Sequence, residues 1–401
     1  MEEAMEDYKV STDMLHLSKY EVYGKLPDLF TFDNGTRMTS PAQWEARRAE
    51  IYKQAVELQY GTMPPSPEVF ELQELYIGGK GHHNTYRITA GTKQKQVSFT
   101  ARLFLPDWGV PTPTPLPPVI VNGDLSFEDI YDKEYLHAAL DEGIAWMMFD
   151  RTEIVQDIQF KGRGHGPLHE VYPEYTFGAI GAWAWGYSRC VDALEQLGLT
   201  NPDMVVFSGH SRGGKTAALA GALDQRAAIV NPNETCAGAC SCYRIYLEGN
   251  YMGNDDPNRP LMQKRSERLC DLWANFDFWM GPDLGQYADR PQDLPFDAHS
   301  LKAMIAPRTL FISEAAGDLW SCLIGSWQTT MAAAEVFKYL GASDNLYWYF
   351  RPGVHGHRPV DVQMLVNIIK QKTLGTPTDE KFFHTSFEKP ELIFDWRAPE
   401  A

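Results

Sequence analysis

The sequence lacks long apolar runs and a recognisable leader segment. No stretch of about 18 consecutive apolar residues occurs, so we expect no transmembrane helix. The N-terminal segment MEEAMEDYKVSTDMLHLSKYEVYG is acidic and contains no apolar centre of the kind that a signal peptide needs. We therefore expect a cytoplasmic protein; the alternative is a secreted protein whose signal has been removed.

Basic residues are scarce as well. The 401 residues include 36 Lys and Arg against 53 Asp and Glu, which gives a formal net charge of −17. Such a surface repels nucleic acids and anionic membranes, so we expect neither as a partner. Because 44% of the residues are hydrophobic, the chain can still bury a large core, in one domain or two.

Cysteine is also rare, with six residues in the whole chain. This number excludes a disulfide-based scaffold. Three cysteines cluster at 236, 240 and 242, but they form no CxxC pair and no histidine is close in sequence, so a metal site is not favoured. We expect buried thiols packed behind a sheet; the alternative is a disulfide that involves Cys236, Cys240, Cys242 or Cys270.

Strands and helices alternate through the larger part of the chain. A proline-rich stretch at 111–118 is typical of an exposed connector, and the alternation begins after it. Short apolar strands are predicted at 119–121, 144–149, 204–207, 227–230, 309–312 and 346–350, with helices at 135–142, 177–198, 216–222, 329–339 and 360–372. This pattern predicts a mostly parallel central sheet in a three-layer α/β/α sandwich, with the active site at the carboxyl ends of the strands.

The segment before the alternation carries a different pattern. An amphipathic helix is predicted at 41–56, with Ser40 as its N-cap, and strands are predicted at 69–77, 84–90 and 97–105. We expect an N-terminal arm over residues 1–45, a single catalytic domain over 46–375, and a C-terminal tail over 376–401 that packs on the domain.

The segment GHSRGGKT at 209–216 fits two motifs at once. As G-x-S-x-G it is the nucleophile elbow of an α/β-hydrolase, with Ser211 as the nucleophile. As G-x-x-x-x-G-K-[ST] it is a phosphate-binding P-loop, with Lys215 and Thr216 on the phosphates and Mg²⁺. Both motifs need a strand before them and a helix after them, and the flanking sequence predicts both elements.

The order of the other polar groups favours the hydrolase. A serine hydrolase of this type needs an acid and then a histidine after later strands. Here Glu234 and Asp318 follow two predicted strands, and His355 and His357 follow a third. A histidine beside a carboxylate can take the serine proton and return it to the leaving group. In contrast, the best strand-then-Asp candidate for a P-loop partner ends at residue 150, before the motif.

The combined motifs resemble those of the glucuronoyl esterases, a serine carbohydrate-esterase family of α/β-hydrolases. Residues 209–215 are similar to the family's G-[HC]-S-R-x-G-K motif, and residues 222–226 (ALDQR) to its A-x-D-x-R continuation. Residues 175–186 resemble the helix before the elbow strand, and WEARRAEI at 44–51 with YGTMP at 60–64 resembles the N-terminal pattern. The resemblance extends from about residue 40 to about residue 370.

This resemblance implies an α/β-hydrolase fold and a specific reaction. The family hydrolyses the ester between 4-O-methyl-glucuronic acid on xylan and alcohols of lignin, without a metal or cofactor. We therefore expect a monomer that acts on a glucuronate-ester carbohydrate. The family position makes Ser211 the nucleophile, Arg212 a support of the oxyanion hole and Lys215 a ligand of sugar hydroxyls. Trp320 would line the sugar pocket, and Glu248 resembles a substrate-binding glutamate if a one-residue gap is allowed.

The acid and the base each have two candidates. Glu234 lies 23 residues after Ser211, at the family's usual acid position, whereas Asp318 occupies the position common to α/β-hydrolases. We favour Glu234, and either acid or both can orient the histidine. His355 follows Arg-Pro-Gly-Val, similar to the family's R-x-G-x-H, so we favour it as the base and expect His357 at the pocket rim.

Three alternative functions stay open at this point. The same fold and triad could act on acetylated xylan or another small ester. The chain could be a carbohydrate-binding protein without activity, although the complete set of serine, acids and histidine argues against this. The P-loop interpretation predicts a nucleoside triphosphatase.

Overall fold

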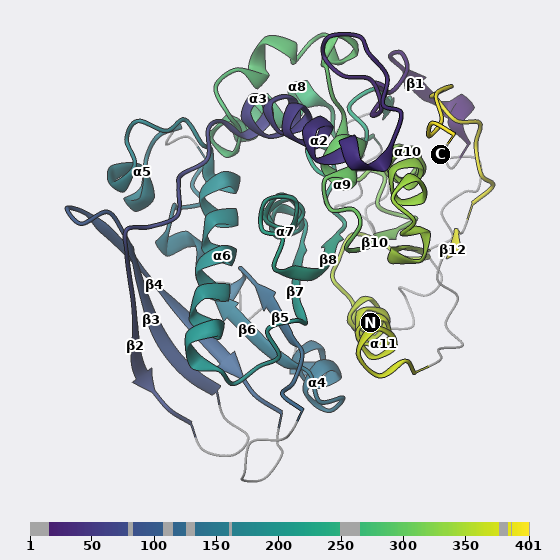
Figure 1. The fold of residues 1–401 in the computed structure, drawn as a ribbon. Coiled ribbons are helices and arrows are strands. Elements are labelled where there is room, and N and C mark those ends of the chain that lie inside the picture. Colours follow the sequence, from purple (N-terminus) through teal and green to yellow (C-terminus); the bar gives the residue numbers. More distant parts are fainter. Residues whose placement is uncertain are drawn as a thin grey trace, which may run out of the picture.

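A ten-stranded sheet forms the centre of the molecule (Figure 1). The computed structural model describes residues 16–78, 83–106, 115–125, 133–159, 163–248, 265–376, 384–385 and 387–400. Within these residues the strand order is β12-β11-β10-β8-β7-β5-β6-β4-β3-β2. Neighbouring strands run parallel from β12 to β6 and antiparallel from β6 to β2. The predicted mostly parallel sheet is confirmed.

Apart from β12, the strands of the large sheet lie where the sequence predicted them. Those of the large sheet are β2 (Val69–Tyr76), β3 (His83–Gly91), β4 (Gln96–Phe104), β5 (Val119–Asn122), β6 (Ala145–Phe149), β7 (Val205–His210), β8 (Ala227–Asn233), β10 (Thr309–Ala315), β11 (Leu346–Arg351) and β12 (His384–Thr385). A separate antiparallel pair is formed by β1 (Tyr20–Val22) and β9 (Ile245–Leu247). The strands β1, β9 and β12 were not predicted because two or three residues are too few to show an alternation.

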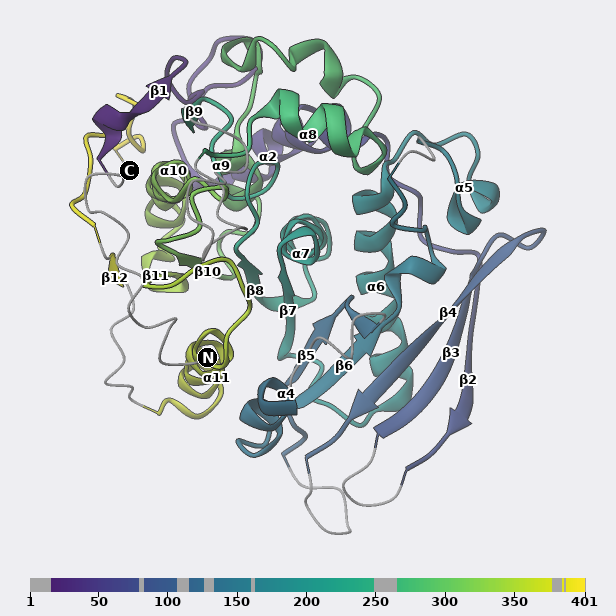
Figure 2. The ribbon, with the colours of Figure 1, turned by 180° about the vertical axis from the view of Figure 1, so that it is seen from behind.

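Helices cover both faces of the sheet, as Figures 1 and 2 show. On one face lie α4 (Lys133–Leu140) and α11 (Pro359–Leu374), and on the other lie α6 (Ala179–Leu197), α7 (Arg212–Leu223) and α10 (Leu323–Tyr339). The other described α-helices are α2 (Trp44–Tyr52), α3 (Leu58–Tyr60), α5 (Pro167–Val171), α8 (Leu269–Phe276) and α9 (Ala298–Ala303). The predicted three-layer arrangement is therefore confirmed, and no described helix is long and apolar enough to span a membrane.

Two hydrophobic cores result from the alternation of side chains along the strands. In β5, Val119 and Val121 face the core under α6 and α7, whereas Ile120 faces the core under α4 and α11. In β7, Phe207 faces the core under α6 and α7, and Val206 faces the core under α4 and α11. Because both faces of the sheet are buried, its central strands are almost continuously apolar until they reach their carboxyl ends.

The described part of the N-terminal arm packs against the described part of the C-terminal tail. The Trp396 indole donates to the Leu26 carbonyl at 2.9 Å, and its ring lies 6.0 Å from that of Phe30. Phe394 is buried beside them. The division into arm, domain and tail stays a prediction, and residues 1–15, 377–383, 386 and 401 lie outside the described residues.

The predicted helix at 41–56 begins as expected but is not uniform. Ser40 and Gln43 form a capping box, and Pro41 occupies the first turn. The α-helical part, α2, passes into a wider π-helical segment, η4 (Lys53–Glu57), before α3. Of the predicted proline-rich connector, residues 111–114 lie outside the described residues, and residues 115–118 lead directly into β5.

Candidate active site

The carboxyl ends of β7, β8, β10 and β11 bring the predicted catalytic residues together. Ser211 follows β7, Glu234 follows β8, Asp318 follows β10 and His355 follows β11. A cavity of about 530 Å³ opens at this edge of the sheet, and Ser211, Asp318 and His355 all line it. This position agrees with the rule that ligands bind at the carboxyl ends of parallel strands.

Ser211 lies on a sharp turn between β7 and α7. Its backbone has φ 54° and ψ −119°, a strained conformation for a residue with a side chain. The turn also needs glycine on both sides. A Cβ at Gly209 would lie 2.3 Å from the Gly213 carbonyl oxygen, and a Cβ at Gly213 would lie 2.9 Å from an Asp124 carboxylate oxygen. The glycines of the G-x-S-x-G motif are therefore required by packing, as expected for a nucleophile elbow.

The same segment does not form a phosphate-binding loop. Residues 212–216, which would cradle the phosphates, are the first turns of α7. The Lys215 ammonium is buried and donates to the Thr235 carbonyl, and the Thr216 hydroxyl donates to the Arg212 carbonyl at 2.9 Å. Because residues 212–216 are coiled into a helix and do not wrap around an anion, and the Thr216 hydroxyl is engaged by the helix itself, the P-loop interpretation is wrong.

Two carboxylates meet at one nitrogen of His355. The Nδ1 atom lies 2.5 Å from Asp318 Oδ2 and 3.2 Å from Glu234 Oε2. Both acids are buried, whereas the imidazole is 41% exposed at the cavity. The structure therefore brings both predicted acids to the base, with the shorter contact to Asp318. The choice of one working acid stays a prediction.

Glu234 has additional partners that fix its position. Its Oε1 accepts from the Arg351 guanidinium at 2.6 Å, and its Oε2 accepts from the Gly356 backbone N–H at 2.7 Å. Arg351 is held in turn by two contacts to Asp361, at 2.8 and 2.9 Å. Glu234 thus connects the loop that carries His355 to a buried ion-pair network, whereas Asp318 is the more direct partner of the imidazole.

These contacts shift the pKa values of His355 and its two acids. Burial lowers the pKa of His355, but the charges and hydrogen bonds of Asp318 and Glu234 outweigh burial and raise this pKa above its ordinary value. Burial raises the pKa of Asp318, yet the charge of His355 and its hydrogen bond bring it below the ordinary value. Burial raises the pKa of Glu234 above its ordinary value. The arrangement therefore favours an imidazolium beside an ionised Asp318.

Arg212 borders the cavity on the side of α8. Its guanidinium pairs with Asp157 at 2.7 Å and lies over the Trp279 ring at 4.9 Å. The Trp279 indole donates to the same Asp157 carboxylate at 3.0 Å, and its ring stacks on Phe276 with centroids 4.0 Å apart. Phe276 and Trp279 line the cavity together with Arg212. The predicted oxyanion residue is thus placed next to Ser211 and kept in one orientation.

Lys215 has a buried partner, Glu267, that the sequence did not predict. Its ammonium lies 3.3 Å from Glu267 Oε2, and both side chains are only 3% exposed. Burial raises the pKa of Glu267, against the opposing charge of Lys215. Lys215, Glu267 and Trp320 all line the cavity, and the Glu267 N–H donates to the Trp320 carbonyl at 3.0 Å.

Glu248 is not part of this cavity wall, which corrects its assignment as a substrate-binding glutamate. Its side chain is 62% exposed and its nearest described cation is Arg268, at 4.0 Å. The cavity is bordered by Glu267 instead. The resemblance at Glu248 required a one-residue gap, and no local sequence pattern indicates that the chain returns to the cavity at Glu267.

His357 lies behind the catalytic group and not at the rim. Its ring is buried, stacks on Tyr135 with centroids 5.2 Å apart and lies 5.8 Å from the parallel ring of His210. Burial lowers the pKa of His357 to about 4, so it remains neutral near pH 7. His210 packs between His355 and His357, with its ring centroid 4.6 Å from that of His355. Its Nδ1 atom lies 2.6 Å from Asn233 Oδ1.

The six cysteines are free thiols, as the favoured interpretation predicted. Five of them are buried and Cys270 is half-buried. The disulfide alternative is therefore not supported. Cys236 differs from the others because it lines the cavity, with Sγ 3.1 Å from the Ser321 hydroxyl.

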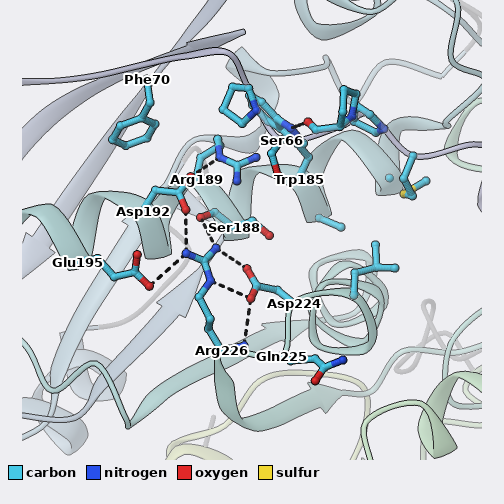
Figure 3. A pocket seen from close by; sticks show the side chains of 17 residues that line it. Ser66, Phe70, Trp185, Ser188, Arg189, Asp192, Glu195, Asp224, Gln225 and Arg226 are labelled. Carbon is cyan, nitrogen blue, oxygen red and sulfur yellow. Dashed lines mark hydrogen bonds and ion pairs between the residues drawn. The ribbon is translucent and has the colours of Figure 1, made fainter. Parts of the chain in front are cut away.

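A larger cavity, of about 830 Å³, lies at the opposite end of α7 (Figure 3). Its charged side chains pair with one another: the Arg226 guanidinium contacts Asp224 at 2.7 Å, Asp192 at 2.8 Å and Glu195 at 3.2 Å. Arg189 also pairs with Asp192, at 2.6 Å. This network explains the A-x-D-x-R motif as a structural brace, because its Asp and Arg bind each other and α6.

Comparison with known proteins identifies the family. The family model for "Glucuronyl esterase, fungi" matches residues 88–341. The 4-O-methyl-glucuronoyl methylesterase of Hypocrea jecorina is 31% identical over 94% of this chain and 76% of that protein. A carbohydrate esterase family 15 glucuronoyl esterase from Caldicellulosiruptor kristjansonii has a TM-score of 0.78 and 27% identity, covering 94% of this chain and 97% of that one.

A third relative was solved with a ligand. A glucuronoyl esterase variant from Sporotrichum thermophile, in complex with methyl 4-O-methyl-β-D-glucopyranuronate, has a TM-score of 0.69 and 24% identity, covering 89% of this chain and 90% of that one. At this identity the match supports the fold. Together with the matching family model and the 31% identical relative, it leads to one assignment. The chain belongs to the glucuronoyl esterase family, whose members are carboxylic ester hydrolases.

Proposed function

We propose that this protein hydrolyses esters of glucuronic or 4-O-methyl-glucuronic acid, with Ser211 as the nucleophile and His355 as the base. The observation that carries the proposal is a single cavity with two sets of groups. Ser211 and His355 form its reactive end, and the buried Lys215–Glu267 pair with Trp320 forms a wall suited to a sugar. The names of the relatives supply the substrate class.

The reaction begins with proton transfer from Ser211. The Nδ1 atom of His355 is engaged by the two carboxylates, so Nε2 is the nitrogen that can accept the Ser211 proton. The hydroxyl oxygen attacks the ester carbonyl, and the imidazolium that forms is stabilised by Asp318 and Glu234. Nε2 then gives the proton to the departing alcohol. Water, activated by the same histidine, releases the uronic acid from Ser211.

The negative charge of the tetrahedral intermediate forms beside the first turn of α7. The first N–H groups of a helix have no partner within it, and they can donate to an oxyanion. The guanidinium of Arg212 adds positive charge at the same end of the helix. Because Arg212 is fixed by Asp157 and Trp279, this charge needs little reorganisation during the reaction.

The wall made by Lys215, Glu267 and Trp320 fits the uronate ring. Lysine donates to hydroxyl groups, the glutamate accepts from them, and an indole packs on the apolar face of a pyranose. An ester of glucuronic acid is neutral, so the negative net charge of the protein does not oppose its binding. The acyl half of an acetyl ester offers this wall nothing to bind, whereas the acyl half of a uronate ester is the sugar itself, which favours the uronate over the acetyl-esterase alternative.

Hydrolysis of benzyl glucuronate and p-nitrophenyl acetate by the wild type and by Ser211→Ala tests the proposal. We expect a much larger kcat/KM for the glucuronate, and loss of both activities in the variant. Activity on the acetate alone would leave the triad intact but refute the uronate assignment. If neither ester is cleaved, or if Ser211→Ala stays active, the proposed mechanism is wrong.

A further inference from the structure

A thiol and a carboxylate lie close to the imidazole of the catalytic histidine. One ligand atom each from Cys236, Asp318 and His355 lie within 4.8 Å of one another. In the sequence, Cys236 has no histidine near it, but the turns after β8, β10 and β11 bring the three residues together. All three line the cavity, so a small ion can reach them from solvent.

We propose that this group binds a thiophilic divalent cation, Zn²⁺ or Cd²⁺, and that the bound ion switches the esterase off. A thiolate, an imidazole and a carboxylate are ligands that zinc accepts at about 2.0–2.3 Å, and three such ligands leave a fourth position for water. Mg²⁺ and Ca²⁺ prefer all-oxygen sites and do not fit this set. The serine mechanism proposed above uses no metal, so the ion acts as an inhibitor.

The charges of such a site balance. The ion displaces the thiol proton of Cys236 when it binds. It also displaces the proton on Nδ1 of His355, and both protons go to solvent. The divalent ion, the thiolate and the Asp318 carboxylate then add up to zero charge. A neutral group of ligands and ion is the least costly one to bury, and the ligands Cys236 and Asp318 are only 4% and 5% exposed.

Binding at Nδ1 removes the function of the base. A neutral imidazole that coordinates a metal through Nδ1 carries its remaining proton on Nε2, so it cannot accept a proton from Ser211. Asp318 is also withdrawn from the imidazolium that it would stabilise. Inhibition should therefore lower kcat and should weaken as the pH falls, because protons compete with the ion for the thiolate and the imidazole.

The first experiment measures hydrolysis of the glucuronate ester against Zn²⁺ concentration, with Mg²⁺ as the control ion. Each variant is compared with its own metal-free rate. We expect wild type to lose most of its activity, to regain it with a chelator, and not to respond to Mg²⁺. Cys236→Ser should need at least about tenfold more Zn²⁺ for the same inhibition. Cys270→Ser, a half-buried thiol outside the cavity lining, should behave as wild type.

A second experiment does not depend on activity. This inference rests on the proposed function only for its rate measurement, so binding is also followed by cadmium–thiolate absorption in a Ser211→Ala background. We expect one Cd²⁺ per chain, and loss of the signal in Ser211→Ala with Cys236→Ala. Equal signals in both proteins, or equal Zn²⁺ inhibition of wild type and Cys236→Ser, would refute the site. Loss of zinc sensitivity in His210→Asn but not in Cys236→Ser would also refute it, because His210, Glu234 and His355 form the neighbouring ligand group.

Discussion

At the scale of single residues, the unusual feature is the pair of acids on one imidazole. A single carboxylate is enough to fix the tautomer of a catalytic histidine. Here Asp318 makes the short contact, while Glu234 is shared among His355, Arg351 and the Gly356 N–H. We infer that the two acids contribute unequally to the basicity of the histidine.

The pH dependence of kcat/KM tests this inference. The two carboxylates raise the pKa of His355, and only the neutral imidazole can take the Ser211 proton, so kcat/KM should rise with pH through that pKa. Asp318→Asn removes the charge at 2.5 Å and should move this rise to lower pH by about one unit or more. Glu234→Gln, at 3.2 Å, should move it less. An unchanged pH profile in both variants would contradict the shared-acid arrangement.

The sequence could place most of the reactive residues but not all of their partners. Ser211, Asp318 and His355 follow strands whose apolar pattern is strong, so their common position at one edge of the sheet was predictable. The choice between the acids was not, because it depends on distances of tenths of an ångström. Glu267 was missed for a different reason: a buried lysine needs a carboxylate, but only the fold shows which one.

At the scale of elements, α8 and the 3₁₀ turn after it, η7 (Asp277–Trp279), were not predicted and yet shape the cavity. They hold Phe276 and Trp279 in a stack beside Arg212. This aromatic wall is chemically different from the wall of Lys215, Glu267 and Trp320. Since an ester has an acid half and an alcohol half on either side of its carbonyl carbon, the aromatic wall is suited to an aryl or benzyl alcohol.

Substitution of Phe276 by Ala tests this role. We expect KM for benzyl glucuronate to rise several-fold, by an amount that corresponds to about 1 kcal/mol of lost aromatic packing, with little change for methyl glucuronate. Trp320→Ala serves as the matched control, because a residue of the sugar wall should weaken both esters equally. An equal effect of Phe276→Ala on the two esters would show that the wall does not recognise the alcohol.

At the scale of the whole molecule, the mostly parallel sheet and its two-sided helix cover were predictable because both faces of the sheet are buried and the strands are therefore strongly apolar. The contacts of the outer segments were not predictable in the same way. Residues 16–40 and 387–400 have no regular periodicity, and their positions depend on individual contacts such as that of Trp396 with Leu26. Long-range packing of irregular segments leaves no local pattern in the sequence.

The Arg226 network provides a test of stability that is separate from activity. Arg226 joins Asp224, at the end of α7, to Asp192 and Glu195 on α6 (Figure 3). Asp224 is 8% exposed, so Arg226→Gln leaves a nearly buried carboxylate without its cation and should lower the free energy of unfolding by about 1–3 kcal/mol. Chemical denaturation of wild type and variant measures the difference.

The control is an exposed ion pair of the same kind. Arg290 pairs with Asp293 at 3.5 Å, and both side chains are about half exposed, so Arg290→Gln should change stability by less than about 1 kcal/mol. Arg226→Gln should also leave kcat/KM near the wild-type value, because the 12 residues of α7 separate the brace from Ser211 by about 18 Å. A large loss of activity without a loss of stability would instead connect the far cavity to catalysis, and equal effects of the two substitutions would show that the brace adds no more than a surface pair.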